Sequence, residues 1–413
     1  MTSEICLMNS LAVVLAADSA TTVEYNGKNG QERRYFKGAN KIFQLSKHQP
    51  VGLMLYNTAS LLRVPWEVIV KEFRKDLGDR SFNSVRQYAE EFISFVEGST
   101  TFFPLDERKK AFDEALIDQI IALLVSLREG DVGEITIDDD VINEYFADLP
   151  SDENLPLDRN YLDDLWQRSE DMVLHLIEEW TANLGFKREC DKNSLANLIF
   201  RGALHTQCAD DNYTGFVFAG FGEHSVFPEM TSLKRCRIVG ERFLVSEEED
   251  INVSREVPAV IEGFAQTSMV DTFTLGISFE VFASLQRIIA EEFGLLIREL
   301  QDRKAALPND DELGLLLRSR IDSFTSKMFD YTRDDHNGPL RRVLGVLPVD
   351  EMAELAETLI NLQSLKEKVT KPSETVGGPV DVAAITRSEG LVWIRRKHYF
   401  DAEINSRYFT RQG

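Results

Sequence analysis

Residues 1–18, MTSEICLMNSLAVVLAAD, carry the clearest signal for the fold of this chain. A polar start leads into the run from Leu11 to Ala17, which is apolar, carries β-branched residues and contains no turn residue. Such a run is typical of a strand that is buried on both faces. A strand so near the beginning of the chain brings the first residues to the edge of a core.

Thr2 is the first candidate for chemistry. Its side chain is small enough for the initiator methionine to be removed, which would leave a free α-amine beside a hydroxyl. A threonine hydroxyl that is activated by its own N-terminal amine is a known nucleophile in catalysis. A threonine at the second position is by itself a common residue without a function, so the interpretation depends on the residues that follow.

Two further candidates lie downstream. Asp18 ends the first strand with an acid, and a polar stretch with two glycines follows at residues 26–30. A pair of strands is then predicted at residues 40–45 and 51–55, on either side of a turn. Lys41 lies at the start of that pair.

Together these residues resemble the proteasome β-subunit and its bacterial relatives, which are N-terminal-nucleophile hydrolases. Members of that family carry a nucleophilic threonine, a V-V-L-A-A-D-S segment, a lysine that opens a K-x-I/F-x-L strand, and a G-x-M strand. This chain has Thr2, VVLAADS at 13–19, KIFQL from Lys41 and GLM at 52–54, and Thr2 lies sixteen residues before Asp18, as in the family. The resemblance covers residues 2–100 and returns near the C-terminus at Gly377-Gly378.

The resemblance implies a site with four parts. Thr2 would attack an amide carbonyl, and its α-amine, whose unperturbed pKa is about 8, would take the proton. The charge of Lys41 would lower that pKa, and Asp18 would hold the lysine in place. Backbone N–H groups near Asn57 would bind the oxyanion, at a position where the family usually has glycine. The residues expected to support the amine are Ser373, where the family has an aspartate, and either Thr267 or Ser268 where it has a serine.

The implied fold is α+β: the four-layer α-β-β-α sandwich of the N-terminal-nucleophile hydrolases, enlarged by helical insertions. Residues 1–99, 208–268 and 346–413 are predicted to form the sandwich, and residues 100–207 and 269–345 to form the two insertions. Helical spacing supports packing helices at residues 66–73, 84–96 and 348–360. Their inward faces are predicted to carry Trp66, Ile69, Val70 and Phe73, then Val85, Tyr88, Ala89, Phe92 and Val96, and finally Met352, Leu355, Ala356, Leu359 and Ile360.

Composition narrows the class of partner and the compartment. The chain has 413 residues, 43% of them hydrophobic, which suits a large core, and a net charge of −23, which argues against nucleic acid. Acidic runs such as Glu247–Asp250 are interpreted as solvated loops. No apolar run reaches the ~18 residues of a membrane span, and no signal peptide precedes Leu11. The four cysteines show no C-x-x-C pattern and are interpreted as structural thiols in a reducing compartment. We therefore expect a cytoplasmic protein, and the absence of a long apolar run argues against a membrane partner.

Other constellations are weaker. The six histidines have no metal-binding spacing, and His205-Thr-Gln-Cys208 is interpreted as structural. No cofactor or metal is expected. The sequence therefore predicts a threonine-type N-terminal-nucleophile hydrolase that cleaves amide bonds in peptides or proteins, a proteasome-like peptidase. The resemblance also implies a homo-oligomer and leaves room for an ATPase or adaptor partner. Two alternatives stay open: a catalytically silent scaffold or interaction subunit of the same fold, and an amidase that acts on a small molecule.

Overall fold

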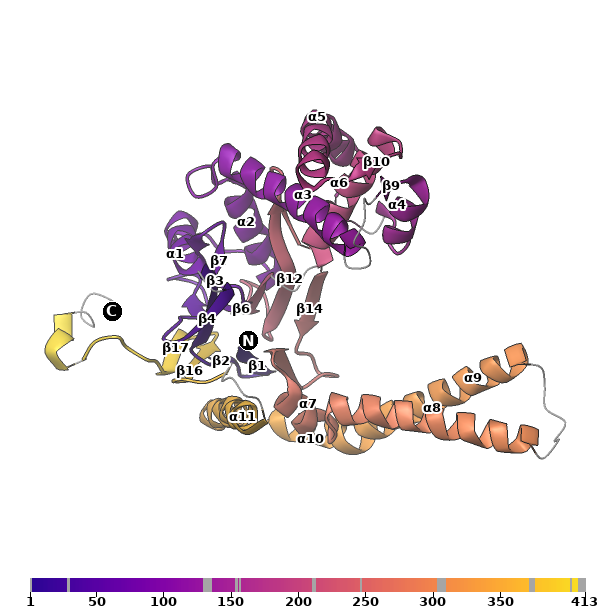
Figure 1. The fold of residues 1–413 in the computed structure, drawn as a ribbon. Helices are drawn as coiled ribbons and strands as arrows, with labels where there is room; N and C mark the ends of the chain where they lie inside the picture. The colour runs from indigo at the N-terminus through magenta and orange to yellow at the C-terminus, as the bar shows by residue number, and fades with distance from the viewer. Residues whose placement is uncertain are drawn as a thin grey trace.

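The structure is a computed structural model, and it describes residues 2–27, 30–128, 136–152, 155, 157–209, 213–245, 247–302, 310–370, 376–401 and 403–407. Within these ranges the chain is a mixed α/β protein with two large antiparallel sheets, helices against them and a projecting helical arm (Figure 1). This much of the predicted fold class is confirmed.

The first large sheet contains the N-terminal strands. β1 (Ser3–Asn9) and β2 (Ala12–Ala17) form its central hairpin. The remaining strands come from far along the chain: β15 (Ala259–Ala265) pairs with β1, β16 (Asp381–Thr386) with β2, and β17 (Gly390–Arg395) with β16. Every residue of β2 is buried, which confirms the prediction of a strand covered on both faces.

The second large sheet is built around the strand pair predicted at residues 40–55. β5 (Ile42–Gln44) and β6 (Val51–Asn57) pair as predicted. On its other side β6 pairs with β11 (Thr214–Gly220), which pairs with β12 (Glu229–Val239), and β12 pairs with β13 (Arg242–Leu244). β14 (Glu247–Asn252) also pairs with β12. The smaller strand pairs are β3 (Ala20–Gly27) with β4 (Gly30–Lys37), β7 (Ser60–Leu61) with β8 (Val64–Pro65), and β9 (Thr136–Ile137) with β10 (Lys187–Arg188).

Side chains of β2 show how the two sheets are joined. Successive residues of a strand point to opposite faces. Val13 and Leu15 therefore lie in the core that the first sheet shares with the second, together with Met54 of β6. Val14 and Ala16 point the other way, into a core with helix α11 (Val349–Thr370). Each sheet thus has one face against the other sheet.

The helices that follow β8 cover the second sheet. α1 (Trp66–Leu77) and α2 (Val85–Gly98) bury the predicted residues against it. The Trp66 ring packs edge-on against the Phe216 ring of β11, with 4.7 Å between the ring centroids. The Trp66 Nε1–H donates a hydrogen bond to Thr214 Oγ1 at 2.8 Å. The predicted inward faces of α1 and α2 are confirmed, as is that of α11, where Met352, Ala356, Leu359 and Ile360 are buried and Leu355 is partly buried.

Helices dominate the two segments beyond this plan. α3 (Leu105–Arg128), α4 (Asp139–Tyr145), α5 (Arg159–Leu184) and α6 (Lys192–Ala209) share a core of their own. The later segment holds α7 (Ser268–Leu275), α8 (Phe279–Asp302), α9 (Asp310–Tyr331), the π-helix η2 (Thr332–Asn337) and α10 (Gly338–Leu344). The predicted domain boundaries remain a prediction.

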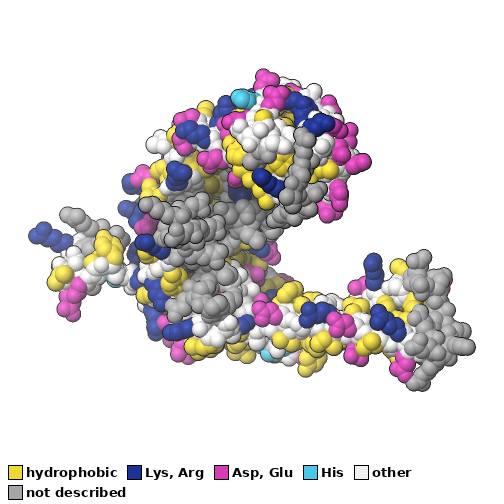
Figure 2. All heavy atoms as spheres, in the orientation of Figure 1, with side chains coloured by type: hydrophobic (Ala, Val, Ile, Leu, Met, Phe, Trp, Pro, Cys, Tyr) yellow, Lys and Arg dark blue, Asp and Glu magenta, His cyan; other side chains and the backbone are white. Residues whose placement is uncertain are grey.

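The projecting arm consists of α8 and α9, which run side by side away from the sheets (Figure 1). Hydrophobic side chains lie along its visible face (Figure 2), and the exposed ones include Phe279, Leu295 and Leu315. Among the described residues, no single helix is long and apolar enough to cross a membrane. The pair formed by α7 and residues 279–300 of α8, bent by 71°, meets both criteria only when the two are joined.

Two sequence interpretations are corrected by the fold. The polar start is itself the buried strand β1, because Ile5 and Leu7 fill one core while Cys6 and Met8 fill the other. The acidic run Glu247–Asp250 belongs to strand β14 and is not a loop. Contacts with α2 and β12 hold this strand in place. Arg86 of α2 forms ion pairs with Glu248, at 2.6 Å, and with Asp250. The Thr231 hydroxyl of β12 donates a hydrogen bond to Asp250 Oδ1 at 2.7 Å.

Candidate active site

Three of the predicted site residues meet where β1 begins, β2 ends and β5 begins. The β1–β2 register places Asp18 beside Ser3, whose N–H donates to Asp18 Oδ1 at 3.3 Å. Lys41 forms a direct ion pair with the same carboxylate oxygen. Thr2, Asp18 and Lys41 are 4%, 1% and 6% exposed. The structure therefore brings the three into one buried cluster, while their catalytic roles stay predictions.

The C-terminal glycine pair closes this cluster from the far end of the chain. The Gly377 N–H donates to Asp18 Oδ2 at 2.7 Å, and the Ser19 N–H donates back to the Gly377 carbonyl at 3.3 Å. Asp18 thus accepts two backbone N–H groups in addition to the Lys41 ammonium. Such contacts fix the carboxylate, and through it the lysine, in one position.

Glu4 is the member of the cluster that sequence reasoning missed. Its side chain is fully buried, its Oε2 accepts a hydrogen bond from Thr2 Oγ1 at 3.2 Å, and its Oε1 lies 3.0 Å from Lys41 Nζ. The signal that could have found it is the strand period: residues two apart on a strand point to the same face, so Glu4 had to accompany Thr2 once β1 was identified as a strand.

The electrostatics of the cluster follow from its composition. Glu4 and Asp18 share one ammonium in a place without bulk water. Burial raises the pKa of Glu4 from its ordinary 4.5 to about 7, and the Asp18 carboxylate adds to the rise while the Lys41 ammonium opposes it. Desolvation prevails because a charged carboxyl loses its hydration in the core. Glu4 therefore exchanges its proton near neutral pH.

A small cavity opens beside Thr2. Its volume is about 140 Å³, and Thr2, Lys41, Leu55, Asn57 and Glu67 are among its lining residues. Asn57, the predicted oxyanion position, has a φ of 64°. This left-handed conformation favours glycine, and asparagine tolerates it better than most other residues. The geometry thus explains how asparagine can stand where the family has glycine, and Asn57 lines the same cavity as Thr2 and Lys41.

Of the two predicted supporting serines, only Ser268 lies within the described residues, and its contacts are with α11. The Ser268 hydroxyl donates to Gln363 Oε1 at 3.0 Å and accepts from Lys366 Nζ at 2.8 Å, so it is engaged with α11. Ser373 lies outside the described residues. The segment before Ser268 does reach the cluster through Gln266, whose N–H donates to the Thr2 carbonyl at 3.0 Å and whose carbonyl accepts the Ser3 hydroxyl at 3.1 Å.

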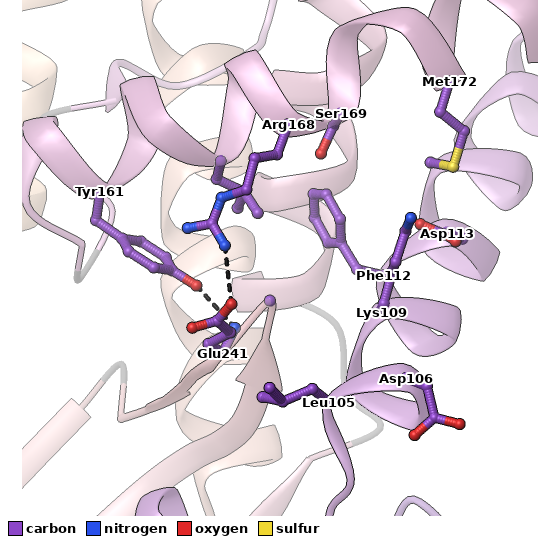
Figure 3. A pocket seen from close by; sticks show the side chains of 12 residues that line it. Leu105, Asp106, Lys109, Phe112, Asp113, Tyr161, Arg168, Ser169, Met172 and Glu241 are labelled. Atoms are coloured by element: carbon purple, nitrogen blue, oxygen red, sulfur yellow. Dashed lines mark hydrogen bonds and ion pairs between the residues drawn. The ribbon is translucent and has the colours of Figure 1, made fainter.

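A larger cavity, of about 310 Å³, lies between α3 and α5 (Figure 3). Arg168 pairs there with Glu241 at 2.8 Å, and the Glu241 N–H donates to the Tyr161 hydroxyl at 2.8 Å. These contacts tie its polar groups to one another. In the described part of the chain, no group of three or more His, Cys, Asp or Glu side chains is placed to hold a metal ion. The smaller cavity is the candidate active site because Thr2, Lys41 and Asn57 line it.

Comparisons with known proteins give distant structural likenesses. A Gly-1 mutant of Anbu from Hyphomicrobium sp. strain MC1 shares 10% identity, with 100% of this chain and 94% of that chain covered at a TM-score of 0.27. The Anbu complex from Pseudomonas aeruginosa, described as a helical assembly, shares 11% identity, with coverage of 98% and 92% at a TM-score of 0.28. No protein-family model matches the chain, and no curated protein matches it.

These comparisons correct the resemblance drawn from the sequence. The two solved structures named above are Anbu chains, neither is a proteasome β-subunit, and no family model matches the chain. The quoted motifs are short segments around Thr2, Asp18 and Lys41, and short segments alone do not define a family. What the site can do must therefore be argued from its own residues.

Proposed function

We propose that this protein is a threonine-type N-terminal-nucleophile hydrolase that cleaves amide bonds in peptides. The observation that carries the proposal is the position of the Thr2 hydroxyl, which lines a cavity and belongs to the same buried cluster as the Lys41–Asp18 ion pair. A purely structural strand end has no need of a buried ammonium between two carboxyls, because burying such charges costs free energy.

The residues supply the parts of an acyl transfer. Thr2 Oγ attacks the amide carbon, the C–N bond breaks as the amine leaves with a proton, and water then hydrolyses the ester on Thr2. Removal of Met1 would free an α-amine that can accept a proton, and the nearby Lys41 ammonium favours its neutral form. A backbone N–H near Asn57 would stabilise the oxyanion on the other side of the cavity.

The packing of the sheets and helices supports this proposal. The two sheets share one core, α1 and α2 cover the second sheet, and α11 covers the first. From this packing we infer a four-layer α-β-β-α sandwich. In such a sandwich the first residue of the chain lies at the end of a central strand, where an N-terminal nucleophile has to be. The exposed apolar residues of α8 and α9 support self-assembly, because an oligomer would cover them.

One observation favours a second candidate, a catalytically silent scaffold: Thr2 is only 4% exposed. The experiment that separates the two is hydrolysis of a panel of fluorogenic peptide amides and small amides by the wild type and Thr2→Ala. The proposal expects peptide hydrolysis that disappears in Thr2→Ala. Cleavage of small amides alone would point to an amidase, and absence of any Thr2-dependent cleavage by a folded protein would favour the scaffold.

A further inference from the structure

Glu4 is a buried acid that the mechanism above does not use. The roles of nucleophile, ammonium and anchor fall on Thr2, Lys41 and Asp18. All residues of strand β1 are buried, and apart from Ser3, Glu4 and Asn9 their side chains are apolar. Glu4 is therefore the one carboxyl in this strand. A carboxyl without exposed surface is costly to keep unless it is paired. Its presence against the proposed nucleophile calls for a chemical explanation.

The two oxygens of Glu4 have different partners. Oε2 accepts the hydrogen bond of Thr2 Oγ1 at 3.2 Å, and Oε1 faces Lys41 Nζ at 3.0 Å. The Asp18 carboxylate lies on the same ammonium and is held by the N–H groups of Ser3 and Gly377. The order along this chain of contacts is therefore hydroxyl, carboxyl, ammonium, carboxylate. Glu4 is the member that touches the reacting oxygen.

We propose that Glu4 is the general base that takes the proton of the Thr2 hydroxyl, so that this step does not depend on the N-terminal amine. The proposal rests on the proposed function of Thr2. As the Oγ–C bond forms, the hydroxyl proton moves to Glu4 Oε2, and it is then donated to the amide nitrogen as the C–N bond breaks. In the second half, Glu4 takes a proton from the attacking water and returns it to Thr2 Oγ.

The electrostatic surroundings suit this role. A general base works best when its pKa lies near the working pH, and burial raises the pKa of Glu4 from 4.5 to about 7. The charged groups that face it are Lys41, from the segment that enters β5, and Asp18, from the end of β2. Lys41 favours the carboxylate and Asp18 the neutral acid, so neither form of Glu4 is locked.

The test is the pH dependence of Thr2 acylation in the full-length chain. A peptide β-lactone, which acylates the hydroxyl alone, is used between pH 5 and 9 on the wild type, Glu4→Gln and Glu262→Gln. Glu262 on β15 is a matched control, since burial also raises its pKa to about 7, and it pairs across the strands with Cys6 and not with Thr2. Acylation is read as the mass of the adduct, and folding as circular dichroism.

The wild type is expected to react faster as the pH rises, with an apparent pKa of about 7. Glu4→Gln should lose this pH dependence and about 10²–10⁴-fold in rate, whereas Glu262→Gln keeps both. A folded Glu4→Gln that retains the rate and the pH profile overturns the role of Glu4. If Glu4→Gln does not fold, Glu4→Asp replaces it: its shorter carboxyl should keep a pH limb but react at least tenfold more slowly, and an unchanged rate overturns the proposal. Absence of Thr2 acylation in the wild type at every pH is a different result, because it removes the proposed function itself.

Discussion

Thr2 Oγ1, in the residue immediately before strand β1, donates a hydrogen bond across 3.2 Å to Oε2 of Glu4 within that strand. The strand period alone brings the proposed nucleophile and a buried carboxyl together, without any loop to position them. The Lys41 ammonium then joins this pair to Asp18. The stability and the reactivity of the N-terminus are therefore coupled through one small group of charges.

Removing the Lys41 ammonium should destabilise the fold. Lys41→Met leaves the buried Glu4 and Asp18 carboxyls without their counter-charge, and we expect a loss of about 3–5 kcal/mol in the free energy of unfolding, measured in urea. Lys71→Met is the matched control, because its ion pair with Glu67 is at the surface and should be worth less than about 1 kcal/mol. Equal effects of the two variants would contradict the account.

The raised pKa of Glu4 makes stability depend on pH in a defined direction. Glu4 holds its proton more tightly in the folded chain, with a pKa of about 7, than in the unfolded chain, with a pKa of 4.5. Its contribution to the free energy of unfolding therefore falls as the pH rises from 4.5 through 7, by an amount on the order of 3 kcal/mol. Glu4→Gln should gain stability relative to the wild type across this window. A difference between the two proteins that stays constant with pH would refute the assignment.

Ala265 has a φ of 59° at the end of β15, opposite Ser3 of β1. An alanine in the left-handed region is strained by about 1–2 kcal/mol, and glycine is not. Ala265→Gly should therefore stabilise the chain by about 0.5–1 kcal/mol in denaturant unfolding. Ala259→Gly, at the other end of the same strand and outside the left-handed region, should destabilise it by about 1 kcal/mol. A loss of stability in both variants would show that the backbone of Ala265 is not strained.

Asn57 tests the oxyanion position. Asn57→Gly suits a φ of 64° and should keep peptide hydrolysis within a few-fold of the wild type. Asn57→Val cannot adopt this φ without strain, so the backbone must shift and any N–H aimed at the oxyanion moves with it. We expect a loss of about 10²–10³-fold in kcat for the valine variant. Similar kcat values for the two variants would place the oxyanion donor elsewhere.

The sequence predicted local features well. The strand pair on either side of residues 46–50 and the inward faces of α1 and α2 are found in the structure. Each depends on a period or a spacing within one short segment, which a single sequence displays directly.

Features that depend on partners distant in sequence could not be predicted. The acidic residues of β14 form a strand because β12 pairs with them and Arg86 neutralises their charge. The Ser268 hydroxyl is hydrogen-bonded to Gln363 and Lys366 on α11. Glu4 was missed because carboxyls usually lie at the surface; the strand period places it on the side of Thr2, but its counter-charge, Lys41, comes from the segment that enters β5. Propensity gives no sign of such pairings before the chain is folded.

The intact mass of the purified protein shows most directly whether Thr2 is a live N-terminal nucleophile. The mass is measured before and after treatment with a peptide epoxyketone, which needs both a free α-amine and the hydroxyl, for the wild type and for Thr2→Ala. We expect loss of the initiator methionine and a single adduct that is absent from Thr2→Ala. A retained methionine with no adduct on a folded protein would contradict this expectation.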